Sequence, residues 1–227
     1  MNKWVAALVT TTIAMGATSA NITTGSYFGM SAGYGSSTAR LSTTKATAGV
    51  FTGGAVGARD IGTTAVNIGA HFGYGWVANC FYFGGEFAYT YDNPKISDNL
   101  DLFGTSGQMM LKRTGYVQAA FRGGYMFVSN SHFYIRFGGN MSKWSITDSL
   151  NGQFNTARAG NSSKTRLSFS PGFGLEAAVH PNVYVRVEYV YEFGPSIRAT
   201  NSSIPNTYTN AGVLRTQSGK MGLSYKF

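Results

Sequence analysis

Charged residues are scarce in this chain of 227 residues. They make up 12% of it, against about 25% in a typical globular domain, so its composition is not that of an ordinary soluble enzyme. Proline is rare, with five residues, and no long apolar run follows the N-terminus, which argues against a bundle of membrane-spanning helices. Glycine (30), phenylalanine (16) and tyrosine (14) are abundant instead, and this mixture favours strands and tight turns.

Cysteine is also nearly absent, since Cys80 is the only one. A single cysteine excludes an internal disulfide and a zinc site made of several thiolates. The sequence contains no phosphate-binding loop, no H-E-x-x-H motif and no other spacing typical of a metal site. We therefore expect no cofactor and no metal, and we expect Cys80 to lie near a membrane interface without a redox role.

The N-terminus has the pattern of a secretory signal peptide. A short positive region ending at Lys3 precedes a mostly apolar stretch, residues 4–17, and the small residues Thr18, Ser19 and Ala20 follow. We predict a signal peptide over residues 1–20 and a single domain over residues 21–227. The alternative is a structural N-terminal helix.

The predicted mature chain is basic. Without Lys3 it has 17 basic and 9 acidic residues. The basic residues are scattered rather than gathered in a patch, so nucleic acid is not an expected partner. For an exported protein the nearby polyanion is the phosphorylated lipid of the outer leaflet.

Apolar and polar residues alternate with a period of two, which predicts strands with two different faces. In the seventh segment, for example, Val183, Val185 and Val187 alternate with Tyr184 and Arg186. The predicted strands occupy eight segments: 25–35, 63–76, 81–91, 114–127, 133–144, 165–179, 183–193 and 213–227. The apolar face of a segment continues for about ten residues, the length that crosses a bilayer at a tilt.

The connections alternate between short and long. Short turns are predicted at Asn79, at 129–131 and at Pro181–Asn182, and long polar loops at 36–62, 92–113, 145–164 and 194–212. This alternation and the even strand number predict an all-β fold, an eight-stranded antiparallel up-and-down transmembrane β-barrel with its short turns in the periplasm. Closure removes the sheet edges that lipid cannot satisfy.

The chain ends in a polar and aromatic pattern formed by Lys220, Gly222, Tyr225 and Phe227. This pattern looks like the assembly signal of outer-membrane barrels. Together with segments such as 27–35 and 81–86, it makes residues 21–227 resemble the small eight-stranded barrels of the outer-membrane protein A, OmpX and opacity-protein superfamily. The resemblance implies location in the bacterial outer membrane and recognition by the barrel-assembly machinery, without a periplasmic peptidoglycan-binding domain. The resemblance says little about a specific function, because one fold carries many functions.

Charges of both signs lie on the predicted inner face. We predict that they form a lumen charge network, made by Glu86, Arg122, Arg136, Glu176, Arg186 and Glu188. The interior of an eight-stranded barrel is packed, so a structural network of ion pairs is favoured over a gated ion path. Glu176 and Arg186 are symmetric about Pro181 and are predicted to pair across the hairpin.

A catalytic triad is a more specific alternative interpretation of the residues in the lumen. Ser31 lies in a G-x-S-x-G pattern, and His71 would face Glu86 if Ala78 and Asn79 formed the turn. The pattern lies within a strand rather than at a strand-to-helix elbow, so we expect a packed polar interior and no enzyme activity. The other two histidines, His132 and His180, fall in predicted turns and are expected to be solvated.

Aromatic residues mark both predicted membrane interfaces. The expected periplasmic girdle consists of Trp76, Phe81, Phe127, Phe133, Tyr225 and Phe227. The expected outer girdle consists of Tyr34, Tyr89, Tyr91, Tyr189 and Tyr191.

The long loops are where binding is expected. Basic residues lie in or near them: Arg40, Lys45, Arg59, Lys112, Arg113, Arg158, Lys164, Arg166, Arg198 and Arg215. They would contact lipopolysaccharide phosphates or a polyanionic host ligand, unless they are simply solvated. We predict a monomeric surface protein with a structural or adhesive role through four extracellular loops. The alternatives are a narrow porin-like channel and a lipid-modifying hydrolase.

Overall fold

The computed structural model describes residues 21–47, 55–102, 105–151, 160–201 and 206–227. The predicted signal peptide, residues 1–20, lies outside this part of the chain, so the domain boundary at residue 20 stays a prediction. Among the described residues, no helix combines the length and apolar character needed to pass through a bilayer.

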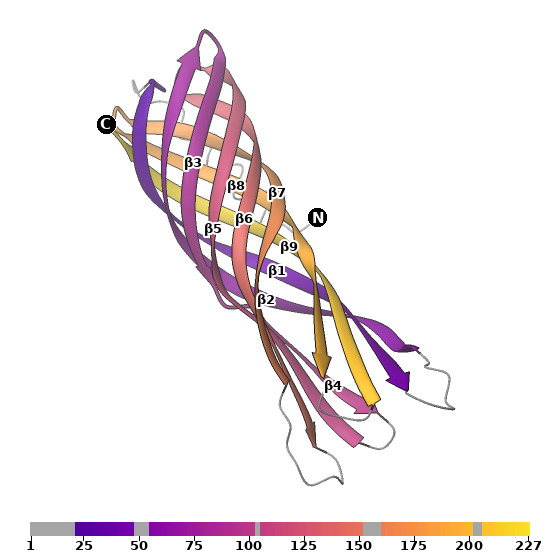
Figure 1. The fold of residues 1–227 in the computed structure, drawn as a ribbon. Coiled ribbons are helices and arrows are strands. Elements are labelled where there is room, and N and C mark those ends of the chain that lie inside the picture. Colours follow the sequence, from indigo (N-terminus) through magenta and orange to yellow (C-terminus); the bar gives the residue numbers. More distant parts are fainter. Residues whose placement is uncertain (1–20, 48–54, 103–104, 152–159, 202–205) are drawn as a thin grey trace.

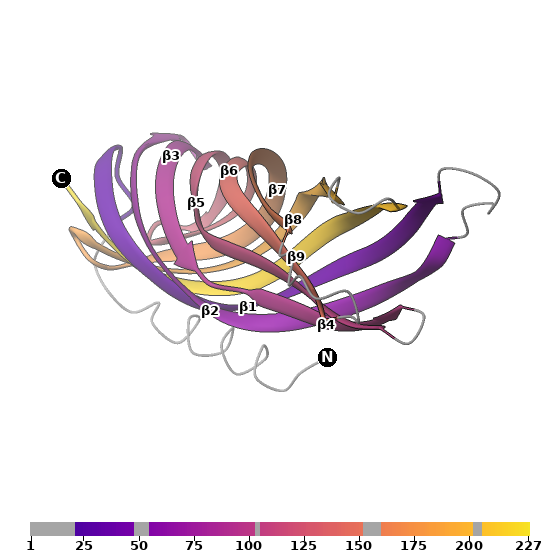
Figure 2. The same cartoon turned by 60° about the horizontal axis from the view of Figure 1, so that its bottom comes forward.

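The described residues form one closed antiparallel sheet (Figures 1 and 2). Strands that follow each other in sequence pair, except β3 and β4. In addition, β1 pairs with β9, and β3 pairs with β5 to close the ring. The strands are β1 (Gly25–Thr47), β2 (Ala55–Ala78), β3 (Phe81–Asp92), β4 (Lys95–Leu102), β5 (Thr105–Val128), β6 (Ser131–Asn151), β7 (Gly160–His180), β8 (Val183–Asn201) and β9 (Asn206–Lys226). The predicted all-β barrel is confirmed.

The barrel wall contains eight strand positions, here called staves, although the described residues form nine strands. The reason is that β3 and β4 occupy one position, end to end. Both strands pair with β5, and only Asn93 and Pro94 separate them. Proline has no N–H to give to a ladder, so the stave breaks there. The facing strand β5 has a register shift at the same level, where Gly115 has a φ of 114°. The predicted strand number of eight is therefore confirmed.

The short turns gather at one end of the barrel, here called the short-turn end, with Gly25 and Phe227 near it. The predicted turn at Pro181–Asn182 is confirmed, and Glu176 faces Arg186 as expected. The predicted short turn at Asn79 is confirmed, but it consists of Asn79–Cys80 and not of Ala78–Asn79, the condition on which His71 would face Glu86. Asn79 has a φ of 54°, a conformation that asparagine tolerates better than most residues.

The predicted long loops are largely strand. Beyond the barrel, the strands continue as long hairpins toward the lower right of Figure 1, here called the hairpin end. β1 continues to Thr47 and β2 begins at Ala55, inside the region predicted as the first loop. Alternating hydrophobicity marks only the part of a strand that has an apolar environment on one side, whereas ladder hydrogen bonds continue with polar residues as well.

At the hairpin end the wall divides into two four-stranded sheets. The β7–β8 ladder ends at Phe169–Phe193, and the β2–β3 ladder ends at Asn67–Asp92. Beyond these pairs, β8, β9, β1 and β2 continue as one sheet and β4 to β7 as the other. A buried apolar cluster joins the two sheets, and we call it the hairpin-end cluster: Ala39, Leu214 and the partly buried Ile61 from the first, with Ile96, Leu111 and Trp144 from the second.

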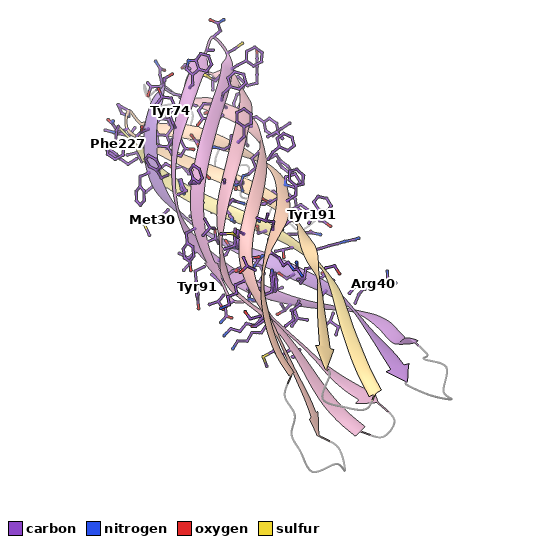
Figure 3. The ribbon with its side chains drawn as sticks, viewed as in Figure 1. Met30, Arg40, Tyr74, Tyr91, Tyr191 and Phe227 are labelled. Carbon is purple, nitrogen blue, oxygen red and sulfur yellow. The ribbon has the colours of Figure 1, made fainter. Side chains whose placement is uncertain are left out.

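The outer face of the barrel is apolar and the inner face is polar, the reverse of a water-soluble barrel. Phe87 is 67% exposed, whereas Arg122 is fully buried. Met30, Tyr74 and Phe227 project away from the ribbon in Figure 3. All predicted girdle residues are exposed except Tyr191, which is partly buried against Phe193 at a ring distance of 4.7 Å. The two aromatic girdles therefore lie on the outer face, as predicted.

Candidate functional site in the barrel lumen

Arg122 occupies the middle of the lumen. Its Nη1 donates to Glu176 Oε2 at 2.9 Å, and its Nη2 donates to the hydroxyls of Tyr27 and, at 3.2 Å, Tyr82. The guanidinium also lies 5.0 Å from the ring centroids of both Tyr27 and Tyr134. Burying a charge is costly unless it is paired and hydrogen-bonded, and these contacts satisfy both conditions.

Two further ion pairs surround this centre. Glu86 accepts a hydrogen bond from Arg186 Nη1 at 2.5 Å and another from the Tyr27 hydroxyl at 3.1 Å. Glu188 accepts from Arg136 Nη1 at 3.0 Å, and the Tyr134 hydroxyl donates to its second oxygen at the same distance. The structure thus places all six residues predicted for the lumen charge network inside the barrel and brings them together.

The predicted ion pair between Glu176 and Arg186 is wrong, although their cross-strand register is right. Glu176 on β7 pairs with Arg122 on β5, and Arg186 on β8 pairs with Glu86 on β3. In a narrow closed barrel an arginine side chain reaches a carboxylate on a strand that is not adjacent to its own. The interior therefore links strands across the lumen as well as along the wall.

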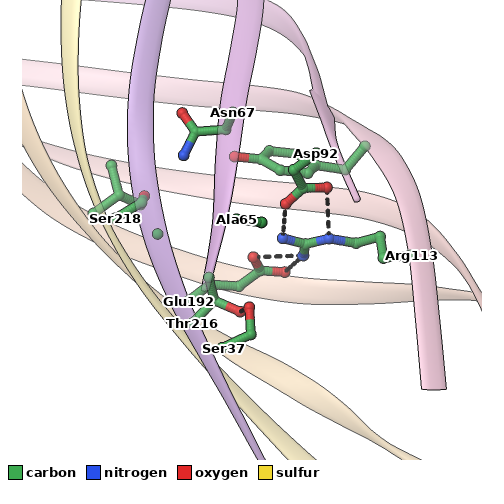
Figure 4. A pocket seen from close by; sticks show the side chains of 11 residues that line it. Ser37, Ala65, Asn67, Asp92, Arg113, Glu192, Thr216 and Ser218 are labelled. Carbon is green, nitrogen blue, oxygen red and sulfur yellow. Dashed lines mark hydrogen bonds and ion pairs between the residues drawn. The ribbon is translucent and has the colours of Figure 1, made fainter. Parts of the chain in front are cut away.

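A second charged layer, which the sequence analysis missed, lies nearer the hairpin end. Arg113 was expected in a loop, but it is 1% exposed and stands between two carboxylates (Figure 4). It donates to both oxygens of Asp92 and to both oxygens of Glu192, the latter at 3.0 and 2.8 Å. The cavity beside Arg113 has a volume of about 10 Å³, room for about one water molecule.

Between the two charged layers the lumen is filled by uncharged polar side chains. Gln118 Nε2 donates to Asn140 Oδ1 and, at 3.0 Å, to Ser170 Oγ, while Gln118 Oε1 accepts from Arg136 at 2.5 Å. Lys220, from the neighbouring part of β9, donates to the Tyr116 hydroxyl at 2.9 Å. These contacts connect the Arg136 pair toward the Arg113 layer, so the polar interior is one continuous network.

Apolar residues lie across the lumen at both ends. At the hairpin end, the Trp144 ring lies 4.9 Å from Arg113 Cζ and belongs to the hairpin-end cluster. At the short-turn end, Ile22 packs with Tyr82, Ala178 and Tyr184. The backbone of Ile22 also donates to the carbonyl of Ser129 at 3.0 Å. The N-terminal residues that precede β1 thus help to close that end.

The triad of Ser31, His71 and Glu86, considered as an alternative, does not assemble. Because the turn is Asn79–Cys80, His71 faces Ala88 rather than Glu86. His71 Nε2 bonds to Ser224 Oγ at 2.8 Å, and Glu86 is engaged by two arginines. The expected packed polar interior is what surrounds these residues.

The prediction for His132 is wrong. This histidine is fully buried, with its ring 4.2 Å from that of Tyr82 and 5.5 Å from that of Tyr134. The turn ends at Asn130 and β6 begins at Ser131, so His132 is an inward-facing strand residue opposite Glu176. His180 is exposed, as predicted, and Cys80 is partly exposed in its turn at the short-turn end.

The C-terminal pattern has a packing role in the barrel. Lys220 points inward, and a Cβ on Gly222 would lie 2.9 Å from Arg186 Nε, so glycine leaves room for the Arg186 side chain. Tyr225 and Phe227 point outward, with their rings in an edge contact at 5.3 Å. Recognition of this pattern by the assembly machinery stays a prediction. In the described part of the chain, no group of His, Cys, Asp or Glu residues is arranged to hold a metal ion.

The chain belongs to the family described as outer membrane protein beta-barrel domain, which matches residues 5–227. It is therefore a transmembrane β-barrel protein of the outer-membrane type. No curated protein matches the chain.

The chain is similar to several solved structures at low sequence identity. OprG of Pseudomonas aeruginosa is 14% identical to this chain. The match covers 90% of this chain and 97% of the OprG chain, with a TM-score of 0.53. The outer membrane protease OmpT of Escherichia coli is 10% identical, with coverages of 93% and 99% and a TM-score of 0.50. Ail of Yersinia pestis, solved with the heparin analogue sucrose octasulfate, is 16% identical, with coverages of 89% and 99% and a TM-score of 0.38.

Proposed function

We propose that the protein is a surface protein of the bacterial outer membrane, with a closed structural barrel and hairpins that bind polyanions. The observation that carries this proposal is the distribution of charge. The charges buried in the lumen form ion pairs, a hydrogen bond to a tyrosine hydroxyl or a cation–π contact with a tyrosine ring. The remaining charges after residue 20 belong to the hairpin regions. The hairpin regions are strongly basic, with eleven basic residues: Arg40, Lys45, Arg59, Lys95, Lys112, Lys143, Arg158, Lys164, Arg166, Arg198 and Arg215.

Only four acidic residues lie in the same regions, at Asp60, Asp98, Asp101 and Asp148. Such an excess of one sign attracts polyanions and speeds their association at low salt. In barrels of this type the short turns face the periplasm and the long connections face outward. The proposed orientation therefore presents the basic hairpins to the cell exterior, where lipopolysaccharide and host glycans carry negative charge.

The filled lumen favours this function over a channel. The arginine layers, the hairpin-end cluster and the packing around Ile22 occupy the interior from one end to the other. A conduction path needs a continuous water-filled passage, and the cavity beside Arg113 holds about one water molecule. The hydrolase alternative has less support still, because Ser31, His71 and Glu86 have no common hydrogen bond.

Binding to immobilised heparin tests the surface function. Proteoliposomes that carry the refolded protein are expected to be retained at low salt. They should be released as sodium chloride approaches about 1 M, where the screening length is about 3 Å. Beads carrying uncharged dextran are the control. Brief trypsin treatment of intact cells should remove the hairpins and the binding together. Retention that does not depend on the salt concentration, or that remains after the hairpins are removed, would contradict the proposal.

Planar-bilayer recording tests the closed lumen. The refolded protein is expected to produce no steady conductance steps, because its interior side chains leave no open path. Resistance of the barrel to trypsin in the same preparation shows that the protein is folded and inserted. Reproducible steps of fixed size from such a preparation would favour the porin-like alternative instead.

A further inference from the structure

Three lysines lie together on the outer surface of neighbouring strands. Lys95 on β4 stands directly opposite Lys112 on β5, and Lys112 in turn faces Ser145 on β6, two residues from Lys143. Their sequence neighbours Ile96, Leu111 and Trp144 point inward into the hairpin-end cluster. Because successive side chains of a strand alternate in direction, the three lysines point outward. We call them the lysine triad.

The triad begins where the apolar band of the barrel ends. On the outer face of β6, Met141, Phe137 and Ile135 follow Lys143 toward the short-turn end, and all three are exposed. On the short-turn side of Lys95 lies Tyr91, an exposed residue of the predicted outer tyrosine girdle. Each lysine is the first charged side chain on the outer face of its stave, counted from the short-turn end. Girdle tyrosines sit at headgroup level, so the triad lies at the level of lipid phosphates.

The triad has no partner in the described part of the chain. Like charges directly opposite in a ladder are unfavourable, and Lys95 and Lys112 form such a pair. Asp92, one of the two carboxylates three residues from Lys95, points inward and is bound by Arg113. On the opposite sheet, by contrast, the exposed Arg40 faces the exposed Asp60 across the β1–β2 ladder.

Directly opposite side chains have Cβ atoms about 5 Å apart and diagonal ones about 7–8 Å. Lysine side chains at these spacings are long and flexible enough to reach one phosphate group together. We infer that the lysine triad binds a phosphate of the phosphorylated glycolipid that forms the outer leaflet. The acyl chains of this lipid would lie along the apolar outer face between the triad and the short-turn end. This inference rests on the outward orientation of the hairpins in the proposed function.

The test compares lipid binding by the full refolded barrel and by one triple variant. Protein in octyl glucoside is mixed with diphosphorylated lipid A or with the same lipid after dephosphorylation, and native mass spectrometry counts bound lipid. Wild type should prefer the phosphorylated lipid by at least about tenfold, since each surface lysine contributes on the order of 1 kcal/mol to anionic-lipid binding. The variant Lys95→Gln, Lys112→Gln, Lys143→Gln should lose this preference.

A matched triple variant separates a site from general charge. Arg40→Gln, Arg166→Gln and Arg215→Gln remove the same net charge from exposed positions on β1, β7 and β9. Because these arginines belong to the polyanion-binding hairpins, the preference should fall somewhat, but clearly less than in the lysine variant. An equal loss in the two variants would contradict a site at the triad. An unchanged preference in the lysine variant would overturn the inference, as would displacement of the lipid by inorganic phosphate alone. Heparin retention of the lysine variant reports the proposed function separately, because the other hairpin charges remain.

Discussion

Replacement of Arg122 by alanine is expected to lower the free energy of unfolding of the refolded barrel by about 3–5 kcal/mol. The guanidinium is fully buried and is the partner of Glu176. Without it, the buried Glu176 carboxylate loses its ion-pair partner, and the hydroxyls of Tyr27 and Tyr82 each lose a donor. The penalty is that of an uncompensated buried charge rather than the net value of one ion pair.

Urea unfolding followed by the shift between folded and heat-denatured forms on a gel measures this effect. Arg215→Ala, at an exposed position on β9, is the control and should change stability by no more than about 0.5 kcal/mol. The double variant Arg122→Met, Glu176→Gln should recover part of the loss, because both charges leave together. A loss below about 1 kcal/mol for Arg122→Ala would mean that water reaches Glu176.

Gly73→Val is expected to prevent formation of the folded, heat-modifiable form, or to cost about 3 kcal/mol where folding survives. A Cβ at Gly73 would lie 2.5 Å from the carbonyl oxygen of Gly85 and 2.3 Å from the Tyr27 hydroxyl. The carbonyl is backbone and cannot move aside without breaking the ladder. The Tyr27 hydroxyl bridges Glu86 and Arg122, so its displacement would also disturb the centre of the lumen.

Gly85→Val is the matched control for this substitution. Gly85 lies on the facing strand, opposite Tyr74, and a Cβ there would meet nothing within 4 Å. The same change of side chain on the lipid face should leave the gel shift and the urea midpoint close to wild type. Equal damage from both variants would show that strand glycines matter here for backbone reasons and not for the space they leave in the lumen.

The faces of the strands could be predicted from the sequence because lipid and lumen impose opposite chemistries. The alternation in 183–193 places Val185 outward and Arg186 inward, and the structure agrees. The turn at Pro181–Asn182 then fixes the register of β7 against β8. The pairing of His71 with Glu86 depended on a turn at Ala78–Asn79. Because the turn is one residue later, His71 faces Ala88 instead.

The partners inside the lumen could not be predicted in the same way. Register relates a residue to its neighbours along the wall, but the partner of Glu176 is Arg122, on β5, two strands away. That choice depends on the diameter and closure of the barrel and on side-chain length. Arg113 was missed for a local reason, since the irregularity at Thr114 and Gly115 shifts the alternation of β5, so that a loop was expected where an inward strand residue lies.

The pairing of β1 with β9 has a consequence for how the protein is made. Every other ladder joins strands that follow each other closely in the chain, whereas Gly29 pairs with Ser224 from the opposite end of the sequence. Loop closure over such a separation is slow, and it is impossible until β9 has been synthesised. Until then the growing protein is a curved sheet with two bare edges, which lipid cannot satisfy. A closed barrel therefore requires β9, and a product that lacks β9 is an open sheet rather than a smaller barrel.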